Sequence, residues 1–134
     1  MNVLRLNAAD RDNDILPLFA ELITEMSCSL RAESQILDVK VGSRLHALYR
    51  AATTSEKYNC GYTLNDSYRE AFEHSELKCV AHNRQGDVRA VELLGHQFFL
   101  AALFQPQLSS TELHPHPLIV AFLEAAKNQS QHLL

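Results

Sequence analysis

The clearest structural signal in the chain is the stretch Leu77-Lys78-Cys79-Val80-Ala81-His82-Asn83-Arg84-Gln85-Gly86-Asp87-Val88-Arg89-Ala90-Val91-Glu92-Leu93. Leu77, Cys79 and Ala81 recur at every second position, which predicts a strand over the first six residues. Residues 83–87 then supply Asn and Gly, both of which tolerate the positive φ that a tight turn requires. Residues 88–93 form the return strand, so the stretch predicts a β-hairpin.

Further strands are predicted on both sides of this hairpin. Gln35–Val41 alternates with period two, and Lys57–Leu64 is rich in Tyr and Thr, as strands are. The apolar run Phe98–Phe104 predicts a strand that is buried on both faces.

Helices are predicted between and around these strands. A polar run at residues 10–14 precedes apolar residues at helical spacing from Ile15 to Ile23, where an irregular loop is the alternative. Gly42-Ser43 begins a short helix over Leu45–Tyr49, and Asn65-Asp66 begins another over Tyr68–Phe72. Pro117 suits the first position of a last helix. Strands with interspersed helices indicate the α/β class.

Composition limits the functions that the chain can have. Its 134 residues make one domain at most, and a net charge of -4 with scattered basic residues argues against a nucleic-acid or anionic-membrane partner. No signal peptide and no apolar run of membrane-spanning length is visible. Three cysteines without paired spacing are typical of reduced thiols. We therefore expect a soluble cytoplasmic domain.

Several segments in register resemble the glutamine amidotransferase domain of the CTP synthases. The match runs over roughly residues 25–127 and is similar to a less studied branch of proteins related to the C-terminal region of CTP synthase. The segments that carry it are Ser27–Leu30, Gly42-Ser43, Leu48-Tyr49, Glu56–Asn65, Val91–Leu93, His96, Phe99, Phe104–Gln107, Ser110, His116–Leu118, Phe122 and Ala125-Ala126.

The resemblance implies a partial class I glutamine amidotransferase-like (flavodoxin-like) sheet with flanking helices, in one truncated domain spanning residues 1–134. It corresponds to the C-terminal half of the family's domain. The family's nucleophilic Cys lies on a turn N-terminal to everything that matches here. We expect an exposed strand edge or apolar face, covered by a second copy of the chain or by a protein that supplies the missing half-domain.

The departures from the family's pattern fall at its catalytic positions. Gln105 stands where the family has a catalytic His, and Gln107 stands where it has a Glu. A carboxamide neither takes up a proton at neutral pH nor orients an imidazole electrostatically. The pair Cys60-Gly61 replaces a His-Arg pair that helps hold substrate. The resemblance therefore implies a non-catalytic amidotransferase-like module that acts through association, without glutaminase chemistry and without a cofactor.

The candidates for a remnant of the ancestral pocket are Tyr58, Cys60, Tyr62, Gln105 and Gln107. The alternative function is an enzyme or a small-molecule-binding protein that uses this pocket and a reactive Cys60 or Cys28. A second interpretation of Gln105-Pro106-Gln107 is a loop kept only for its backbone shape. A fragment of a disrupted gene, without a selected function, is a third possibility.

Other polar residues have structural interpretations. Cys79 fits a small buried hydrophobe, and Glu56 and Glu92 fit solvated or hydrogen-bonded strand carboxylates. His116-Pro117 fits a helix start. The seven histidines show no short ligand spacing such as His-x3-His, so no metal site is predicted.

Overall fold

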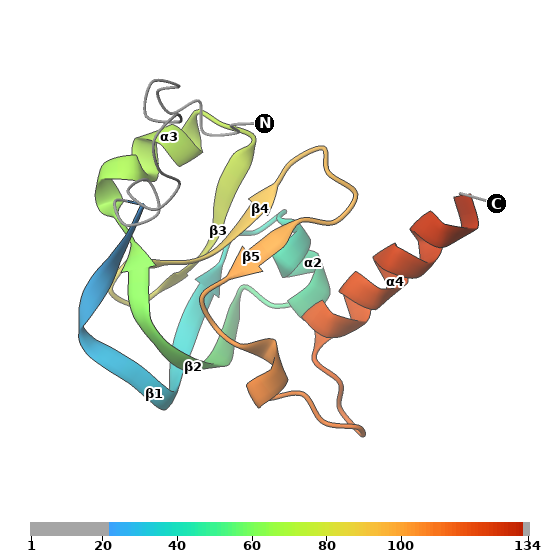
Figure 1. Cartoon of the computed structure of the whole chain (residues 1–134), viewed down its shortest axis with the longest axis horizontal. Coiled ribbons are helices and arrows are strands. Elements are labelled where there is room, and N and C mark those ends of the chain that lie inside the picture. The colour runs from blue at the N-terminus through green and yellow to red at the C-terminus, as the bar shows by residue number, and fades with distance from the viewer. Residues whose placement is uncertain (1–21, 133–134) are drawn as a thin grey trace, which may run out of the picture.

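The computed structural model of the chain describes residues 22–132 and, within that range, all side chains except those of residues 25–30 and 131–132. The elements follow in the order β1 Ile23–Val39, α2 Arg44–Tyr49, β2 Thr53–Leu64, the 3-10 helix η2 Asp66–Tyr68, α3 Arg69–Glu73, β3 Leu77–Asn83, β4 Val88–Leu93, β5 Leu100–Ala102, the 3-10 helix η3 Pro106–Leu108 and α4 Pro117–His132. Strands are interspersed with helices (Figure 1), which confirms the α/β prediction.

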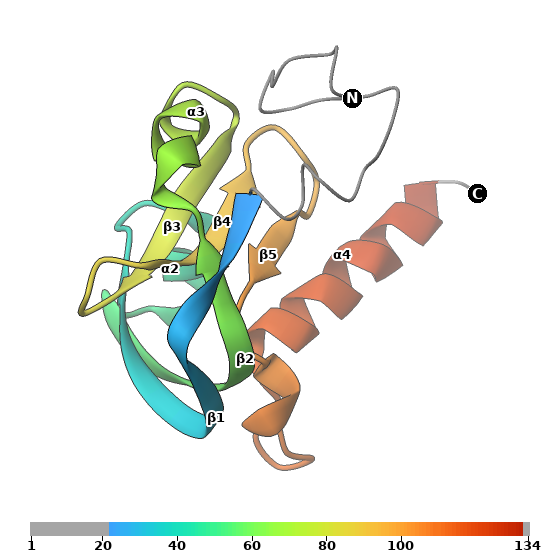
Figure 2. The same ribbon diagram turned by 60° about the vertical axis from the view of Figure 1, so that its left-hand side comes forward.

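The described strands form one sheet in the order β2-β1-β3-β4-β5, and each neighbouring pair is antiparallel. The sheet is curled rather than flat, with β1 and β2 forming a long bent ribbon (Figure 2). Ala32 marks one bend, because it has a φ of 52° at a register shift between β1 and β2. An extra residue in one strand of a pair bends the ribbon in this way.

The predicted hairpin is confirmed by β3 and β4 and by the turn between them. The Asn83 Oδ1 atom accepts hydrogen bonds from the backbone N–H groups of Gln85 (3.1 Å) and Asp87 (2.9 Å), and Gly86 has a φ of 87°. This turn therefore combines an Asn that bonds its own backbone with a Gly in the left-handed region.

The short helices begin as the sequence predicts. Ser43 caps α2 by accepting a hydrogen bond from the backbone N–H of His46 at 3.0 Å. Asn65 caps η2 in the same manner through Ser67. Pro117 is the first residue of α4, which projects away from the sheet (Figure 1).

Two expectations need correction. The run Phe98–Phe104 is not a strand buried on both faces: only Leu100–Ala102 is extended, and Ala101 and Phe99 are exposed. The reason is that β5 pairs with β4 alone among the described strands, so its other side lacks a covering strand. The strand predicted at Gln35–Val41 is the end of a longer β1, and it stops at Val39.

The helix predicted from Ile15 to Ile23 lies outside the described residues except at its end, where Leu22 is helical and Ile23 begins β1. None of the described helices has the length and apolar character needed to cross a membrane.

The core lies between the concave side of the sheet and the helices α2 and α4. Its buried members come from every strand except β5, from α2, from the segment after β5 and from α4: Leu37, Val39, Leu45, Tyr58, Val80, Ala81, Ala90, Phe104 and Leu118. Burial of these side chains is the main stabilising contribution to the fold.

Candidate functional site

Three of the predicted pocket residues lie at alternate positions of β2, and their burial decreases along the strand. Tyr58 is fully buried, Cys60 is half-buried and Tyr62 is exposed. Because alternate residues of a strand share one face, these side chains line one side of β2. The row runs from the core to the surface.

Tyr58 is the buried end of this row. Its ring makes an edge contact with Phe104, with the ring centres 6.2 Å apart, and the Arg89 guanidinium carbon lies 5.4 Å from the ring centre. Burial raises the pKa of the Tyr58 hydroxyl, the negative charge of Glu56 and the Cys60 thiol raise it further, and the positive charge of Arg89 opposes them. The hydroxyl therefore stays protonated. It is buried without a hydrogen-bond partner among the described residues.

Gln105 lies beside β2, with its amide turned to the free edge of that strand. Its backbone N–H donates to the Lys57 carbonyl (3.0 Å), and its side-chain Nε2 donates to the Asn59 carbonyl (3.2 Å). Gln105 thus satisfies two backbone acceptors that a neighbouring strand would otherwise satisfy. Gln107 is exposed in η3, so the structure brings Gln105, but not Gln107, onto the β2 row.

Cys60 is tied to its own strand. Its Sγ atom accepts a hydrogen bond from the Tyr62 N–H at 3.4 Å and donates to the Tyr62 carbonyl at 3.8 Å. Among the described residues, no histidine forms a hydrogen bond with this thiol. A nucleophilic Cys needs a base within hydrogen-bond reach, and this geometry does not provide one. The Cys28 side chain lies outside the described part of the chain.

A buried polar cluster around Glu56, two residues before Tyr58 on the same face of β2, was not foreseen from the sequence. Glu56 is 3% exposed and His116 is 6% exposed, and His116 Nε2 lies 2.8 Å from Glu56 Oε1. The Tyr49 hydroxyl donates to the same Oε1 atom. Burial raises the pKa of Tyr49, and its bond to Glu56 and the charge of Glu56 raise it further. Tyr49 remains a donor at any physiological pH.

The same histidine organises the start of α4. His116 Nδ1 accepts a hydrogen bond from the Leu118 N–H at 3.2 Å, so the proton that Glu56 receives must be on Nε2. The His116 N–H donates to Ser110 Oγ at 3.0 Å. His116 therefore caps the helix with its side chain and fixes the preceding loop.

Arg89 is a further residue whose role sequence reasoning missed. It is fully buried on β4, its Nη2 atom lies 3.1 Å from Asp87 Oδ2, and its Nη1 atom donates to the Tyr62 carbonyl at 3.4 Å. The hairpin pattern alone gave no sign of it. A fully buried Arg needs such partners because desolvating a charge is costly.

No metal site is formed by the residues that the structure describes, since no three or more His, Cys, Asp or Glu side chains come together in a suitable group. Glu56 and His116 are occupied with each other and with Tyr49. The cluster is suited to fixing β2, α2 and α4 relative to one another. Glu56 Oε2 is buried without a hydrogen-bond partner among the described residues, and both side chains are shielded from solvent.

Sequence comparison relates the chain to CTP synthases, although no protein-family model matches it. It is 35% identical to CTP synthase of Bacteroides fragilis over 105 residues, which are 78% of this chain. It is 34% identical to that of Porphyromonas gingivalis over 105 residues and 33% identical to that of Chlorobaculum tepidum over 110 residues. The chain spans about a fifth (20%) of the length of these relatives.

Comparison with solved structures also finds a similar fold in a CTPS protein. The chain superposes on the Trypanosoma brucei CTPS glutaminase domain, solved with bound acivicin, with a TM-score of 0.73 and 23% identity. The match covers 80% of this chain and 46% of that chain. The curled antiparallel sheet with its flanking helices is therefore part of the fold of a glutaminase domain.

Proposed function

Because the chain is a glutamine amidotransferase-like domain related to CTP synthase, we propose that it is a non-catalytic module that acts by associating with a second copy of itself or with another protein. The observation that carries the proposal is the pair of hydrogen bonds that Gln105 donates to β2. At the position where the resemblance implies a catalytic His, this Gln holds the Lys57 and Asn59 carbonyls of β2. A carboxamide in that role stabilises the strand through hydrogen bonds and cannot act as a base.

Exposed apolar side chains support the association. Phe122 is 57% exposed and Leu123 is 60% exposed, side by side on the projecting helix α4, and Phe99 is 41% exposed at the start of β5. The Phe98 and Phe122 rings make an edge contact with centres 5.9 Å apart, so α4 and the segment before β5 share one apolar surface. Neighbouring exposed apolar residues of this kind mark interaction surfaces.

The extent of the match to the solved glutaminase domain also supports association. More than half of that solved chain has no counterpart in the match, which covers 46% of it. Strand β5 has one neighbour, β4, among the described strands. A second molecule that covers this side would pair with the free edge of β5 and bury Phe99.

Gel filtration with light scattering tests the proposal. We expect a dimer or higher assembly for the chain alone, or a stable complex when a candidate partner is added, and we expect Phe122→Ser with Leu123→Ser to abolish it. Leu113→Ser is the matched control, because Leu113 is 86% exposed on a loop away from the shared surface. A monomer that binds no partner, or equal loss in both variants, would overturn the proposal.

A second candidate function, binding of a small polar molecule, rests on unpartnered polar atoms. Tyr58 Oη and Gln105 Oε1 are buried without hydrogen-bond partners among the described residues, and buried polar atoms are normally satisfied. Cys60 lies on the same row. If this row binds ligands through a reactive thiol, Cys60 is alkylated about tenfold faster than Cys79, whose pKa is raised by burial. Equal slow alkylation of both would exclude the thiol part.

A further inference from the structure

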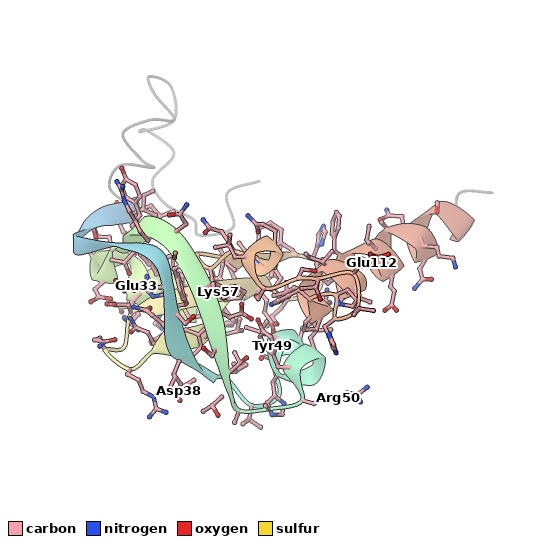
Figure 3. All side chains as sticks on the ribbon, turned by 90° about the horizontal axis from the view of Figure 1, so that it is seen from below. Glu33, Asp38, Tyr49, Arg50, Lys57 and Glu112 are labelled. Atoms are coloured by element: carbon pink, nitrogen blue, oxygen red, sulfur yellow. The ribbon has the colours of Figure 1, made fainter. Side chains whose placement is uncertain are left out.

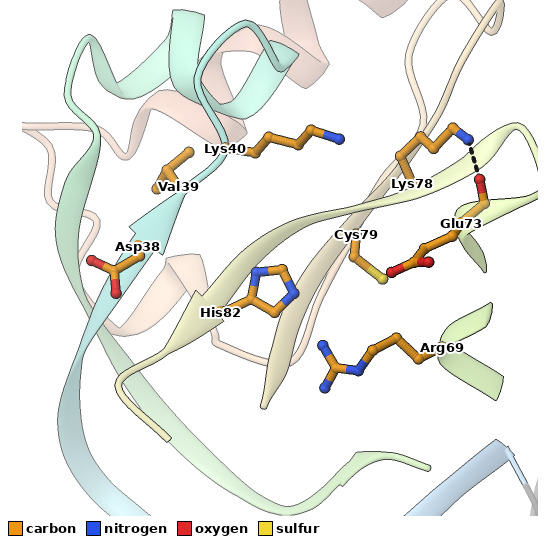
Figure 4. A pocket seen from close by; sticks show the side chains of 8 residues that line it. All are labelled: Asp38, Val39, Lys40, Arg69, Glu73, Lys78, Cys79 and His82. Carbon is orange, nitrogen blue, oxygen red and sulfur yellow. Dashed lines mark hydrogen bonds between the residues drawn. The ribbon is translucent and has the colours of Figure 1, made fainter. Parts of the chain in front are cut away.

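A cavity lies on the side of the sheet opposite the core, where the end of β1, strand β3 and helix α3 meet (Figure 4). Its volume is about 470 Å³, which lies within the range of small-molecule sites. None of its lining residues belongs to the β2 row or to the Glu56–His116 cluster. The cavity is therefore separate from the ancestral pocket.

A β-bulge shapes the floor of this cavity. Cys79 pairs with Val91 and Ala81 pairs with Ala90, so Val80 is an extra residue in β3. In a regular strand, Cys79 and His82 would point to opposite faces, because they are three residues apart. The bulge lets both Val80 and Ala81 enter the core and turns both Cys79 and His82 into the cavity. Bulges commonly re-aim side chains next to functional sites.

Three permanent cations line the cavity, each from a different element. Lys40 follows β1, Arg69 begins α3 and Lys78 lies on β3. Figure 4 shows the Lys40, His82 and Arg69 side chains directed toward the middle of the cavity. No described residue forms a hydrogen bond or an ion pair with the Lys40 ammonium group, so its charge is available.

Arg69 and Lys78 are held in place by other parts of the chain. Arg69 Nη2 donates to Asp66 Oδ1 at 2.6 Å and to the Gly86 carbonyl at 3.0 Å, which fixes the guanidinium at the wall of the cavity. Lys78 Nζ donates to the Glu73 carbonyl at 2.7 Å. Held side chains of this kind lose little conformational entropy when a ligand arrives.

The two lysines of the cavity form no ion pair with a described acidic residue. Asp38 and Glu73 also line it, and no described ion pair joins either of them to Lys40, Arg69 or Lys78. Asp38 lies at the rim beside β1 (Figure 4). Arg69 is paired with Asp66, which does not line the cavity, so Lys40 and Lys78 are the lining cations that form no ion pair with a described carboxylate.

We propose that this cavity binds the phosphate group of a small molecule, either free phosphate or a phosphate monoester, through Lys40, Arg69 and His82. The Lys40 ammonium supplies a point charge, and the Arg69 guanidinium supplies its Nη1 and Nε donors, since Asp66 and Gly86 engage Nη2. His82 donates a third hydrogen bond when it is protonated. The remaining volume accommodates the organic part of a monoester.

The electrostatics of His82 agree with an anion at this place. Burial lowers the pKa of His82, the charges of Arg69 and Lys40 lower it further, and Asp38 opposes them. Glu73 and Lys78 also face the cavity, as does the Cys79 thiol. A dianion bound between Lys40, Arg69 and His82 reverses the unfavourable field, so binding raises the pKa of His82.

Calorimetric titration at low ionic strength tests the proposal, with inorganic phosphate in one arm and glycerol 3-phosphate in the other. We expect saturable binding of one anion per chain. Lys40→Ala weakens it about tenfold, as expected for loss of one charged hydrogen bond, whereas Lys40→Arg retains it. Lys127→Ala is the control, because it removes the same charge from the exposed face of α4. Tighter binding of glycerol 3-phosphate identifies a monoester as the occupant, and equal binding identifies free phosphate.

The pH titration of the His82 imidazole by NMR is a second, independent test. We expect its proton resonances to titrate at higher pH when sulfate, which stays a dianion across this range, is added to wild type but not to Lys40→Ala. No saturable binding below about 10 mM, which corresponds to very weak affinity, would overturn the proposal. So would equal weakening by Lys40→Ala and Lys127→Ala, because that pattern indicates non-specific attraction.

Discussion

Two histidines on opposite sides of the sheet show how one residue type serves two purposes in this protein. His116 is 6% exposed, with both ring nitrogens engaged, by Glu56 on one side and by the Leu118 N–H on the other. His82 is half-buried in the open cavity, among cations that disfavour its protonation. The hydrogen bonds of the His116 ring stabilise the fold, whereas the His82 ring remains available to a ligand.

The difference teaches where function is to be sought in this domain. The Glu56–His116 pair could be mistaken for a catalytic dyad, but its atoms are directed at each other and at the helix that they fix. A catalytic base must instead reach a proton on substrate. Substitutions in the Glu56–His116 cluster and at His82 should therefore differ in their effects on the unfolding free energy.

The largest expected effect is that of Glu56→Ala. It removes the common acceptor of His116 and Tyr49 and leaves two buried donors unpaired. Breaking a buried polar pair in this way costs about 3 kcal/mol of unfolding free energy. Urea denaturation, followed by circular dichroism, measures the loss.

The control for Glu56→Ala is Glu33→Ala on β1, the neighbouring strand of the same ribbon (Figure 3). Glu33 is exposed, so its removal changes the unfolding free energy by less than about 0.5 kcal/mol. If both variants lost the same stability, the buried cluster would not be the link between β2, α2 and α4.

A smaller effect is expected for Tyr49→Phe. The substitution keeps the ring, which makes an edge contact with His116 with centres 5.9 Å apart, and removes only the donor to Glu56. The cost is that of one hydrogen bond, about 1 kcal/mol. Tyr62→Phe serves as the control, since that side chain is 42% exposed. A loss as large as that of Glu56→Ala would mean that the hydroxyl, rather than His116, dominates the cluster.

Local patterns were sufficient to predict much of this fold. The turn at Asn83–Asp87 forms through bonds within five residues, and the Ser43 cap forms within four, so the sequence contains all that is needed. The same holds for Pro117 at the start of α4. Segments whose structure depends on distant partners could not be predicted in this way.

The candidate sites show the limits most clearly. Glu56 and His116 are 60 residues apart, and no spacing rule connects them. The bulge at Val80 depends on the register between β3 and β4, and it accompanies the turn of Cys79 and His82 to one face. The apolar run at residues 98–104 lacked its expected second neighbour strand. Of the predicted pocket residues, Tyr58, Cys60, Tyr62 and Gln105 meet on or beside β2, because alternation along a strand is a local property.

The smallest effect, and the finest test of the comparison, is the pH dependence of His82→Gln. The pKa of His82 is lowered in the folded protein from its ordinary value near 6.5, so the unfolded chain binds more protons between the two pKa values. Wild type therefore loses stability as the pH falls below about 6.5. The variant lacks this part of the loss, whereas His116 is present in both proteins. Urea denaturation at several pH values between about 5 and 7.5 measures the unfolding free energy of both proteins. We expect that of His82→Gln to decrease less than that of wild type as the pH falls. A constant difference across this range would show that neither burial nor the neighbouring cations lower the pKa of His82 in the folded protein, and the distinction between the two histidines would then rest on their hydrogen bonds alone.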